Sequence, residues 1–477
     1  MGEVRAIAPL MDSYLSYFES HRQPFTTPGH KQRASLLDSD LGKVVDLDVP
    51  LYGGLDEIKL THGVLEEAEA LAAKFWLADW TRFSTGGSTH ANQAIALALG
   101  KPGDKVAISR TTHRSLMTAL VLTGLEPLWL SPEIDSATGV PTGIPLAEFE
   151  RTLPHNPVAL LLTEPGYLGT ISDLPPLIAS AHDLKIPVII DAAWGGHFGL
   201  HPALPRHPMQ LGADAFVTSI HKALPGYSAS AIAVARTTLL DRARLEQGFE
   251  STHTTSPAGA PLASIDGVRA LLQIRGEGLL GQLLANINEF HLHLTREFGS
   301  EILLKTSDFA PGRFDPAKVI LRANMIGADG IAIERELIQA GIRVEMADKD
   351  TVVFLATLAD DSNTFAELRK VLIPILHRNV APARKSGAAL SWSVIPEIAV
   401  SLRDAYFAQS ELVEAKNAIG RISSDLVAPY PPGVAVLAPG EIITKGILDG
   451  LLAAQGEGVR IAYATDSTLK KFRVLAK

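Results

Sequence analysis

Alternating strand and helix signals between residues 100 and 235 constrain the fold of this chain more than any other feature. Short apolar runs with the character of buried strands are separated by amphipathic stretches with helical spacing. The predicted strands are Lys105–Ile108, Glu126–Leu130, Val158–Leu162, Val188–Ile190, Ala215–Val217 and Ala231–Val234. This alternation is typical of an α/β fold with a mostly parallel central sheet and helices on both faces. Ligands of such sheets bind outside the carboxyl ends of the strands.

The length of 477 residues is too great for a single hydrophobic core, so we expect several domains. An N-terminal arm is predicted over residues 1–45, with an amphipathic helix at Leu10–Glu19, and a large α/β domain over residues 46–305. The stretch 46–62 is expected to be irregular. A small α/β domain follows over residues 306–385, with one strand expected at Arg343–Val344. After the linker Val380–Ser386, a smaller C-terminal α/β part is predicted over residues 386–477.

Composition and charge limit the classes of protein to which this chain can belong. The formal net charge is −9 and no run of lysine or arginine stands out, which argues against nucleic-acid binding. The chain has no cysteine, so thiol nucleophiles and cysteine-ligated zinc are excluded. The apolar runs are too short to span a bilayer and no secretory signal pattern stands out, so we expect a cytoplasmic protein without a membrane partner.

The stretch Asp214–Gly226 carries an unusual group of polar residues. The buried strand predicted at Ala215–Val217 runs directly into Ser219, His221 and Lys222. A lysine just past a buried strand is suited to forming a Schiff base with an aldehyde cofactor, with nearby hydroxyl groups holding the cofactor's phosphate.

Asp191 ends another apolar run, which begins at Ile186. A carboxylate there is costly unless a cation meets it, and the protonated pyridine nitrogen of pyridoxal phosphate is such a cation. Each residue alone also fits a structural role, with Asp191 capping the next helix and Lys222 reaching solvent. The two together favour a pyridoxal phosphate site.

A candidate phosphate loop, Gly86-Gly87-Ser88-Thr89, separates a strand signal from a helix signal. The free N–H groups and positive dipole end of a helix N-terminus attract phosphate. By itself the loop is better explained by helix capping than by phosphate binding. Ser88, Thr89, Ser219 and His221 together would hold the phosphate, while His113, at the end of another predicted strand, would lie on the face of the ring.

Several motifs together resemble those of the Orn/Lys/Arg decarboxylases, in the short form without an N-terminal receiver-like domain. These motifs are Thr27-Pro28-Gly29-His30-Lys31, Gly87-Ser88-Thr89 with Asn92-Gln93, His113-Arg114-Ser115, Asp191-Ala192-Ala193-Trp194-Gly195-Gly196-His197-Phe198, Ser219-Ile220-His221-Lys222, Thr255-Ser256-Pro257, Ala428-Pro429-Tyr430-Pro431-Pro432-Gly433 and Pro439-Gly440-Glu441. The resemblance implies the aspartate-aminotransferase fold, that of the fold-type I PLP-dependent enzymes. It also implies decarboxylation of lysine, ornithine or arginine to CO2 and a polyamine-type amine.

Carried onto these positions, the resemblance implies that Lys222 bonds to the cofactor, Asp191 pairs with its ring nitrogen and His113 stacks on its ring. Lys222 or His221 would return a proton to Cα. The resemblance also implies a homodimer or larger assembly with shared active sites. Glu441 is the first candidate to meet the distal cation of the substrate, and Glu345 the second.

Trp194 departs from the short relatives, which often carry Asp-Glu-Ala-His where this chain has Asp191-Ala192-Ala193-Trp194. We expect the indole to lie beside the cofactor and to narrow the substrate pocket. A narrower, more apolar wall slightly favours lysine as substrate.

Three alternatives remain open. The first is another reaction on the same scaffold, by an aminotransferase or a decarboxylation-coupled oxidase, although no arginine stands in an obvious motif for clamping an α-carboxylate. The second is a non-catalytic binding or scaffold protein, against which the retention of Asp191 and Lys222 argues. The third is a metal hydrolase, but His197 and His201 lie among prolines without an evident third ligand, so no metal is expected.

Overall fold

The computed structural model describes residues 6–20, 25–45, 47–49, 55, 63–135, 138–385, 395–430 and 433–477. Most of the stretch 46–62 that was expected to be irregular lies outside these residues, as do Ser386 of the linker and the Pro431-Pro432 pair.

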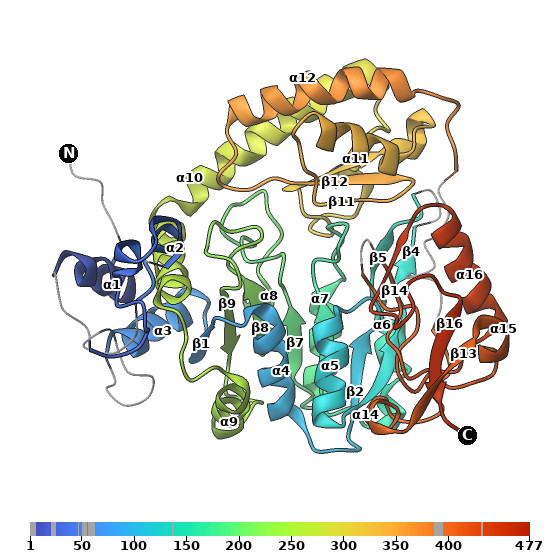
Figure 1. Cartoon of the computed structure of the whole chain (residues 1–477), viewed down its shortest axis with the longest axis horizontal. Coiled ribbons are helices and arrows are strands. Elements are labelled where there is room, and N and C mark those ends of the chain that lie inside the picture. The colour runs from blue at the N-terminus through green and yellow to red at the C-terminus, as the bar shows by residue number, and fades with distance from the viewer. Residues whose placement is uncertain are drawn as a thin grey trace.

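A seven-stranded sheet forms the centre of the molecule (Figure 1). Its strand order is β1 (Trp80–Ser84), β9 (Ala231–Ala235), β8 (Ala215–Ser219), β7 (Val188–Asp191), β6 (Leu160–Thr163), β2 (Lys105–Ser109) and β3 (Glu126–Leu130). Strands β3, β2, β6, β7 and β8 run parallel, and β9 runs antiparallel to both β8 and β1. The predicted mostly parallel sheet is therefore confirmed.

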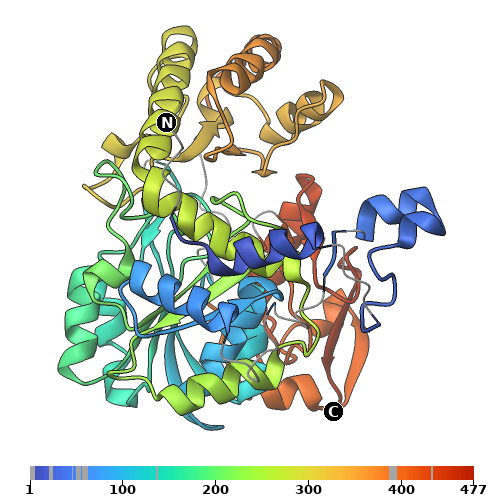
Figure 2. The ribbon, with the colours of Figure 1, turned by 90° about the vertical axis from the view of Figure 1, so that its left-hand side faces the viewer.

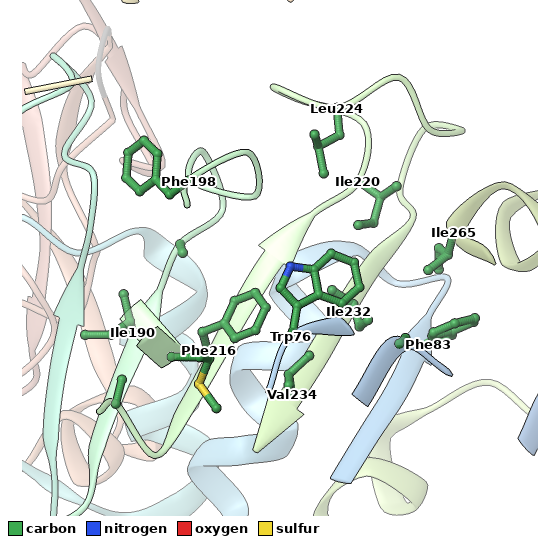
Figure 3. Packing of buried hydrophobic residues seen from close by; sticks show 14 of the residues in the cluster. Trp76, Phe83, Ile190, Phe198, Phe216, Ile220, Leu224, Ile232, Val234 and Ile265 are labelled. Carbon is green, nitrogen blue, oxygen red and sulfur yellow. The ribbon is translucent and has the colours of Figure 1, made fainter. Parts of the chain in front are cut away.

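Helices cover both faces of this sheet, so its strands are apolar on both sides. Successive side chains of a strand point to opposite faces. In β8, Phe216 belongs to one core, where its ring lies 6.1 Å from that of Trp76 (Figure 3). Its neighbours Ala215 and Val217 belong to the other core. The covering helices are α1 (Pro9–Glu19), α3 (Val64–Phe75), α7 (Leu174–Asp183) and α10 (Gly259–Phe298) on the first face, and α4 (Gly87–Leu99), α5 (Arg114–Thr123) and α9 (Arg242–Thr252) on the second.

A small antiparallel sheet, in the order β10 (Lys318–Arg322), β12 (Thr351–Leu355), β11 (Met346–Ala347), lies above the large one (Figure 1). Helices α11 (Gly330–Gln339) and α12 (Ser362–Asn379) cover it. The prediction of a strand at Arg343–Val344 is wrong by a few residues, because the strand that pairs with β12 begins only at Met346.

Helix α10 is shared by two cores. Leu262 to Leu272 pack in the core of the large sheet, whereas Leu280 to Leu294 pack in the core of the small unit. Gly276 and Gly278 lie between these two stretches. Figure 2 shows the helix running from one unit into the other.

The C-terminal part contains two short antiparallel pairs, β13 (Ser410–Glu414) with β16 (Lys471–Leu475) and β14 (Ala428–Tyr430) with β15 (Arg460–Ala462). Helices α14 (Leu402–Phe407), α15 (Ala415–Ala418) and α16 (Lys445–Gly456) complete it. Its own core includes Val427, Ile447 and Phe472. Among the helices that the structure describes, none has the length and apolar character needed to cross a bilayer.

A fully buried ion pair joins the C-terminal part to the central sheet. Arg110, which directly follows β2, donates from Nη1 to Glu441 Oε1 at 2.6 Å and from Nη2 to Oε2 at 3.0 Å. The Ala438 N–H donates to the same carboxylate at 2.7 Å, and the guanidinium lies 4.8 Å from the Trp129 ring centroid. Such a bidentate pair fixes the relative orientation of two elements that are distant in sequence.

This ion pair gives a stability prediction. Arg110→Met leaves a buried carboxylate without its cation, so we expect the free energy of unfolding to fall by about 3–5 kcal/mol in urea titrations. The double variant Arg110→Met/Glu441→Leu removes both charges and should be more stable than Arg110→Met. A double variant at least as unstable as the single one would contradict the prediction.

Candidate active site

A cavity of about 340 Å³ lies at the carboxyl ends of β6, β7 and β8. Thr163, Asp191 and Ser219, the last residues of these three strands, contribute to its wall. The structure brings together around this cavity eight of the residues predicted from sequence, namely Ser88, Thr89, His113, Asp191, Trp194, Ser219, His221 and Lys222. Asn92 and Tyr167 also line it and were not predicted.

Lys222 projects from the turn after β8. Its Nζ lies 4.2 Å from the centroid of the Trp194 ring, and within the described residues it makes no hydrogen bond or ion pair. Burial lowers the pKa of Lys222, while the charges of Asp191 and Glu345 partly oppose this shift. An amine with a lowered pKa has a larger neutral fraction, and the neutral form attacks a carbonyl carbon.

Asp191 is a buried carboxylate, with 3% of the residue exposed. It accepts hydrogen bonds from Asn92 Nδ2 at 3.0 Å and from the Ala193 N–H at 3.2 Å. Burial raises its pKa, and Lys222, Asn92 and Ala193 act in the opposite direction. No cation of the described chain lies within ion-pair distance of it. A protonated ring nitrogen would supply the missing positive charge.

Asn92 holds the Asp191 carboxylate, a role that the sequence analysis did not assign to it. It lies one helical turn after Ser88 on α4, and residues four apart share a helix face. This spacing was the available signal. One face of α4 therefore presents both a hydroxyl group to the cavity and an amide to Asp191.

The loop at the start of α4 forms a cradle with the end of β8. Ser88 Oγ and Ser219 Oγ lie 2.8 Å apart, so the two hydroxyl groups meet at one point of the cavity wall. Gly87 has φ +68°, a conformation that favours glycine, and its N–H donates to Ala229 O at 2.7 Å. The hydroxyl groups and the N-terminus of this 13-residue helix fit a phosphate group.

His113 caps the N-terminus of α5. Its Nδ1 accepts the N–H of Ser115 at 3.2 Å, which assigns the ring proton of the neutral form to Nε2. Burial, with smaller contributions from Lys222 and Arg114, lowers the pKa of His113 to about 4. The imidazole is therefore neutral near pH 7, as suits a ring stacked on an aromatic cofactor.

The two carboxylates predicted to meet a substrate have different positions. Glu441 is fully buried, is bound to Arg110 and Ala438, and is absent from the cavity wall. The prediction of a substrate contact for Glu441 is therefore corrected, because this carboxylate already has its partners. Glu345 is also absent from the cavity wall, but it is exposed just before β11 and interacts electrostatically with Lys222.

The loop after β6 closes one side of the cavity. Glu164, its first residue, is buried and accepts hydrogen bonds from the N–H of Ser172 at 3.0 Å and from the Ser172 hydroxyl. Burial raises the pKa of Glu164 to about 7, against the opposing effects of the Ser172 hydrogen bonds and of Arg313. Tyr167 of the same loop lines the cavity.

The raised pKa of Glu164 predicts a pH-dependent stability. Because the folded state holds this proton up to about pH 7, its stabilising contribution is complete below the usual carboxyl pKa of about 4.5 and is lost as pH rises through about 7. As the pH rises from 5 to 8, we expect the melting temperature of the wild type to fall further than that of Glu164→Gln. A difference in melting temperature between the two proteins that stays constant over this range would contradict the prediction.

The described residues hold no group of three or more histidine, aspartate or glutamate side chains arranged to bind a metal ion. His197 instead donates from Nε2 to Asp315 Oδ1 at 3.1 Å, in a buried pair. The metal-hydrolase alternative therefore has no site among the described residues.

Comparison with known families gives two matches that cover most of the chain. Residues 8–364 match the major domain of the Orn/Lys/Arg decarboxylases, and residues 389–459 match the C-terminal domain of the same family. An arginine decarboxylase of Bacillus subtilis is 32% identical over 470 residues, covering 95% of each chain. An arginine decarboxylase of Halalkalibacterium halodurans is 31% identical and covers 98% of this chain and 97% of its own. A constitutive lysine decarboxylase of Escherichia coli is 24% identical, covering 93% and 77%.

Solved structures show the same fold. The constitutive lysine decarboxylase of Escherichia coli superposes with a TM-score of 0.80 at 20% identity, covering 98% of this chain and 82% of the other. A ureidoglycine-glyoxylate aminotransferase from Bacillus subtilis superposes with a TM-score of 0.55 at 16% identity, covering 74% and 93%. The fold is thus that of fold-type I enzymes, and the full-length sequence matches make this chain a member of the Orn/Lys/Arg decarboxylase family.

Proposed function

We propose that this protein removes the α-carboxyl group of a basic L-amino acid, namely lysine, ornithine or arginine, with pyridoxal phosphate as its cofactor. The products are CO2 and the corresponding polyamine-type amine. The observation that carries the proposal is the presence, on one cavity, of an unpaired lysine amine at Lys222 and a buried carboxylate without a cation at Asp191. Membership of the decarboxylase family supports the reaction type.

The residues of the cavity fit the cofactor group by group. Pyridoxal phosphate supplies an aldehyde that bonds to amines and a pyridinium ring that takes up the electron pair left when CO2 departs. Lys222 would hold the aldehyde carbon, and Asp191 would keep the ring nitrogen protonated. Ser88, Thr89 and Ser219, with His221 beside them, would hold the phosphate. The neutral imidazole of His113 would cover one face of the ring.

Proton return to Cα is assigned to Lys222 Nζ, with His221 as the second candidate. Lys222 lines the cavity and has a lowered pKa, so its amine exchanges protons near neutral pH more readily than an exposed lysine does. His221 Nδ1 lies 3.0 Å from the carbonyl oxygen of Ser230, which leaves only Nε2 to face a substrate.

Two observations bear on which basic amino acid is the substrate, and they favour different ones. The relatives that are 31–32% identical are named arginine decarboxylases, which makes arginine the first candidate. Trp194, which lines the cavity, supports the narrower side chain of lysine. In either case Glu345 is the carboxylate proposed to meet the distal cation.

A homodimer or larger assembly with shared active sites, located in the cytoplasm, is part of the same proposal. Exposed apolar side chains on the N-terminal arm support an assembly, since Phe25, Leu37 and Val44 are 98%, 86% and 77% exposed.

Replacing Lys222 tests the cofactor assignment. We expect Lys222→Ala, purified with added pyridoxal phosphate, to lack the visible absorbance band of a lysine-bound cofactor and to lose turnover altogether. Lys370→Ala, which changes an exposed lysine on α12, is the matched control and should keep both. A Lys222→Ala variant with the wild-type band and rate would overturn the assignment.

A substrate panel tests the reaction. With arginine, ornithine and lysine offered separately, we expect one of them to release CO2 and amine in equal amounts, measured by trapped CO2 and by chromatography of the amine. Stoichiometric keto acid without CO2 would instead support an aminotransferase, and hydrogen peroxide formed with CO2 would support a decarboxylation-coupled oxidase.

A further inference from the structure

Lys318 is a buried cation that contacts Trp194 of the cavity wall without lining the cavity itself, and the proposed function leaves it without a role. It is the first residue of β10, in the small unit, and only 3% of it is exposed. Its Nζ lies 3.8 Å from the centroid of the Trp194 ring. The same ring lies 4.2 Å from the Nζ of Lys222, so the two amines are separated by no more than the sum of these distances.

Two elements of the cavity wall flank Lys318. One is Trp194 itself, and the other is the loop that carries Tyr167. A Cβ added to Gly169 of this loop would lie 2.9 Å from Cγ of Lys318, so the loop packs directly on the lysine stem. The Asp315 N–H donates to Gly169 O at 2.8 Å and holds the start of β10 against the same loop.

The ammonium of Lys318 has no partner that neutralises it within the described chain. It makes no hydrogen bond or ion pair there, and the carboxylates of Asp315 and Glu345 act on it only electrostatically. Asp315 is bound through Oδ1 to His197 and to the Ala317 N–H. Burial lowers the pKa of Lys318 to about 8, with Asp315 and Glu345 opposing the shift and Lys222 adding to it, so the side chain is still mostly protonated at pH 7. A buried ammonium with free donors is unfavourable until an anion reaches it.

The substrate of the proposed reaction carries one anion, the α-carboxylate. Its amino group would replace the Lys222 amine at the aldehyde carbon of the cofactor, which brings the α-carboxylate close to Lys222. No arginine is among the residues lining the described cavity, so no bidentate clamp is available there. We propose that Lys318 binds the α-carboxylate of the substrate and selects amino acids over the amines formed from them. This inference rests on the proposed function.

A lysine suits this position in a decarboxylase. Its ammonium is a point charge that attracts one carboxylate oxygen, whereas an arginine clamp would hold both oxygens and resist their departure. When the bond between Cα and the carboxyl carbon breaks, its electron pair stays on the Cα side and CO2 leaves without charge. The contact with Lys318 is then lost, so the amine product is held less tightly than the substrate.

The experiment compares two ligands on four proteins: the wild type, Lys318→Met, Lys318→Arg and the surface control Lys370→Met. Each full-length protein is loaded with pyridoxal phosphate and mixed rapidly with the preferred amino acid or with its product amine. Dissociation constants are taken from the initial change in cofactor absorbance, before turnover, and KM and kcat are measured separately.

We expect Lys318→Met, which keeps the length of the stem and removes the charge, to weaken amino acid binding about ten- to hundredfold. Its affinity for the amine should stay within about twofold of the wild type. Lys318→Arg should recover most of the amino acid affinity, and Lys370→Met should change neither constant.

Equal weakening for the two ligands in Lys318→Met would overturn the inference, because a merely structural role affects both. Unchanged affinity for both would overturn it as well. A wild type whose cofactor absorbance responds to no basic amino acid would overturn the proposed function, and this inference with it.

Discussion

The burial of charge at the strand ends is the constraint on which the rest of this site depends. Asp191 is buried at the end of β7, Lys222 lies in the turn after the neighbouring strand β8, and neither forms an ion pair within the described chain. The sheet makes their burial possible because its covered faces leave only its carboxyl edge open to a ligand. The Asn92 amide and the Ala193 N–H hold the carboxylate in place, and the Trp194 ring contacts the amine.

The small unit takes part in the site through its first strand. Lys318 contacts the Trp194 ring, and Asp315 is bound to His197, so the loop after β7 is attached to β10 and to the segment just before it. The loop after β6 is attached to the same segment through Gly169. The wall around the reacting atoms is therefore built from both units, and its shape depends on their spacing.

Local sequence signals were sufficient for much of this site. Asp191, Ser219 and Lys222 follow short apolar runs that predict strands. The alternation of such runs with helical stretches predicted the mostly parallel sheet, and the polar residues at the strand ends indicated where the cavity lies. Lys318 had no comparable signal, because it begins its strand and only tertiary packing brings it to Trp194. Glu441 stands in a motif shared with a family, but a motif does not show that its carboxylate is occupied by Arg110, which is more than 300 positions away in sequence. The strand expected at Arg343–Val344 was displaced because strand pairing, which sequence periodicity does not reveal, decides where a short edge strand begins.

Helix α10 has a mechanical consequence for the chemistry. One continuous helix of 40 residues is packed into two separate cores, so the connection between the units is a rigid element rather than a loop. Gly276 and Gly278 lie between the stretches that pack in the two cores, and a glycine inside a helix weakens it by up to about 1 kcal/mol. The intrinsic helix propensity of α10 is therefore low at the boundary between the units. A bend at this point would tilt β10 relative to the large sheet, and it would move Lys318 relative to Trp194 through residues far from the cavity.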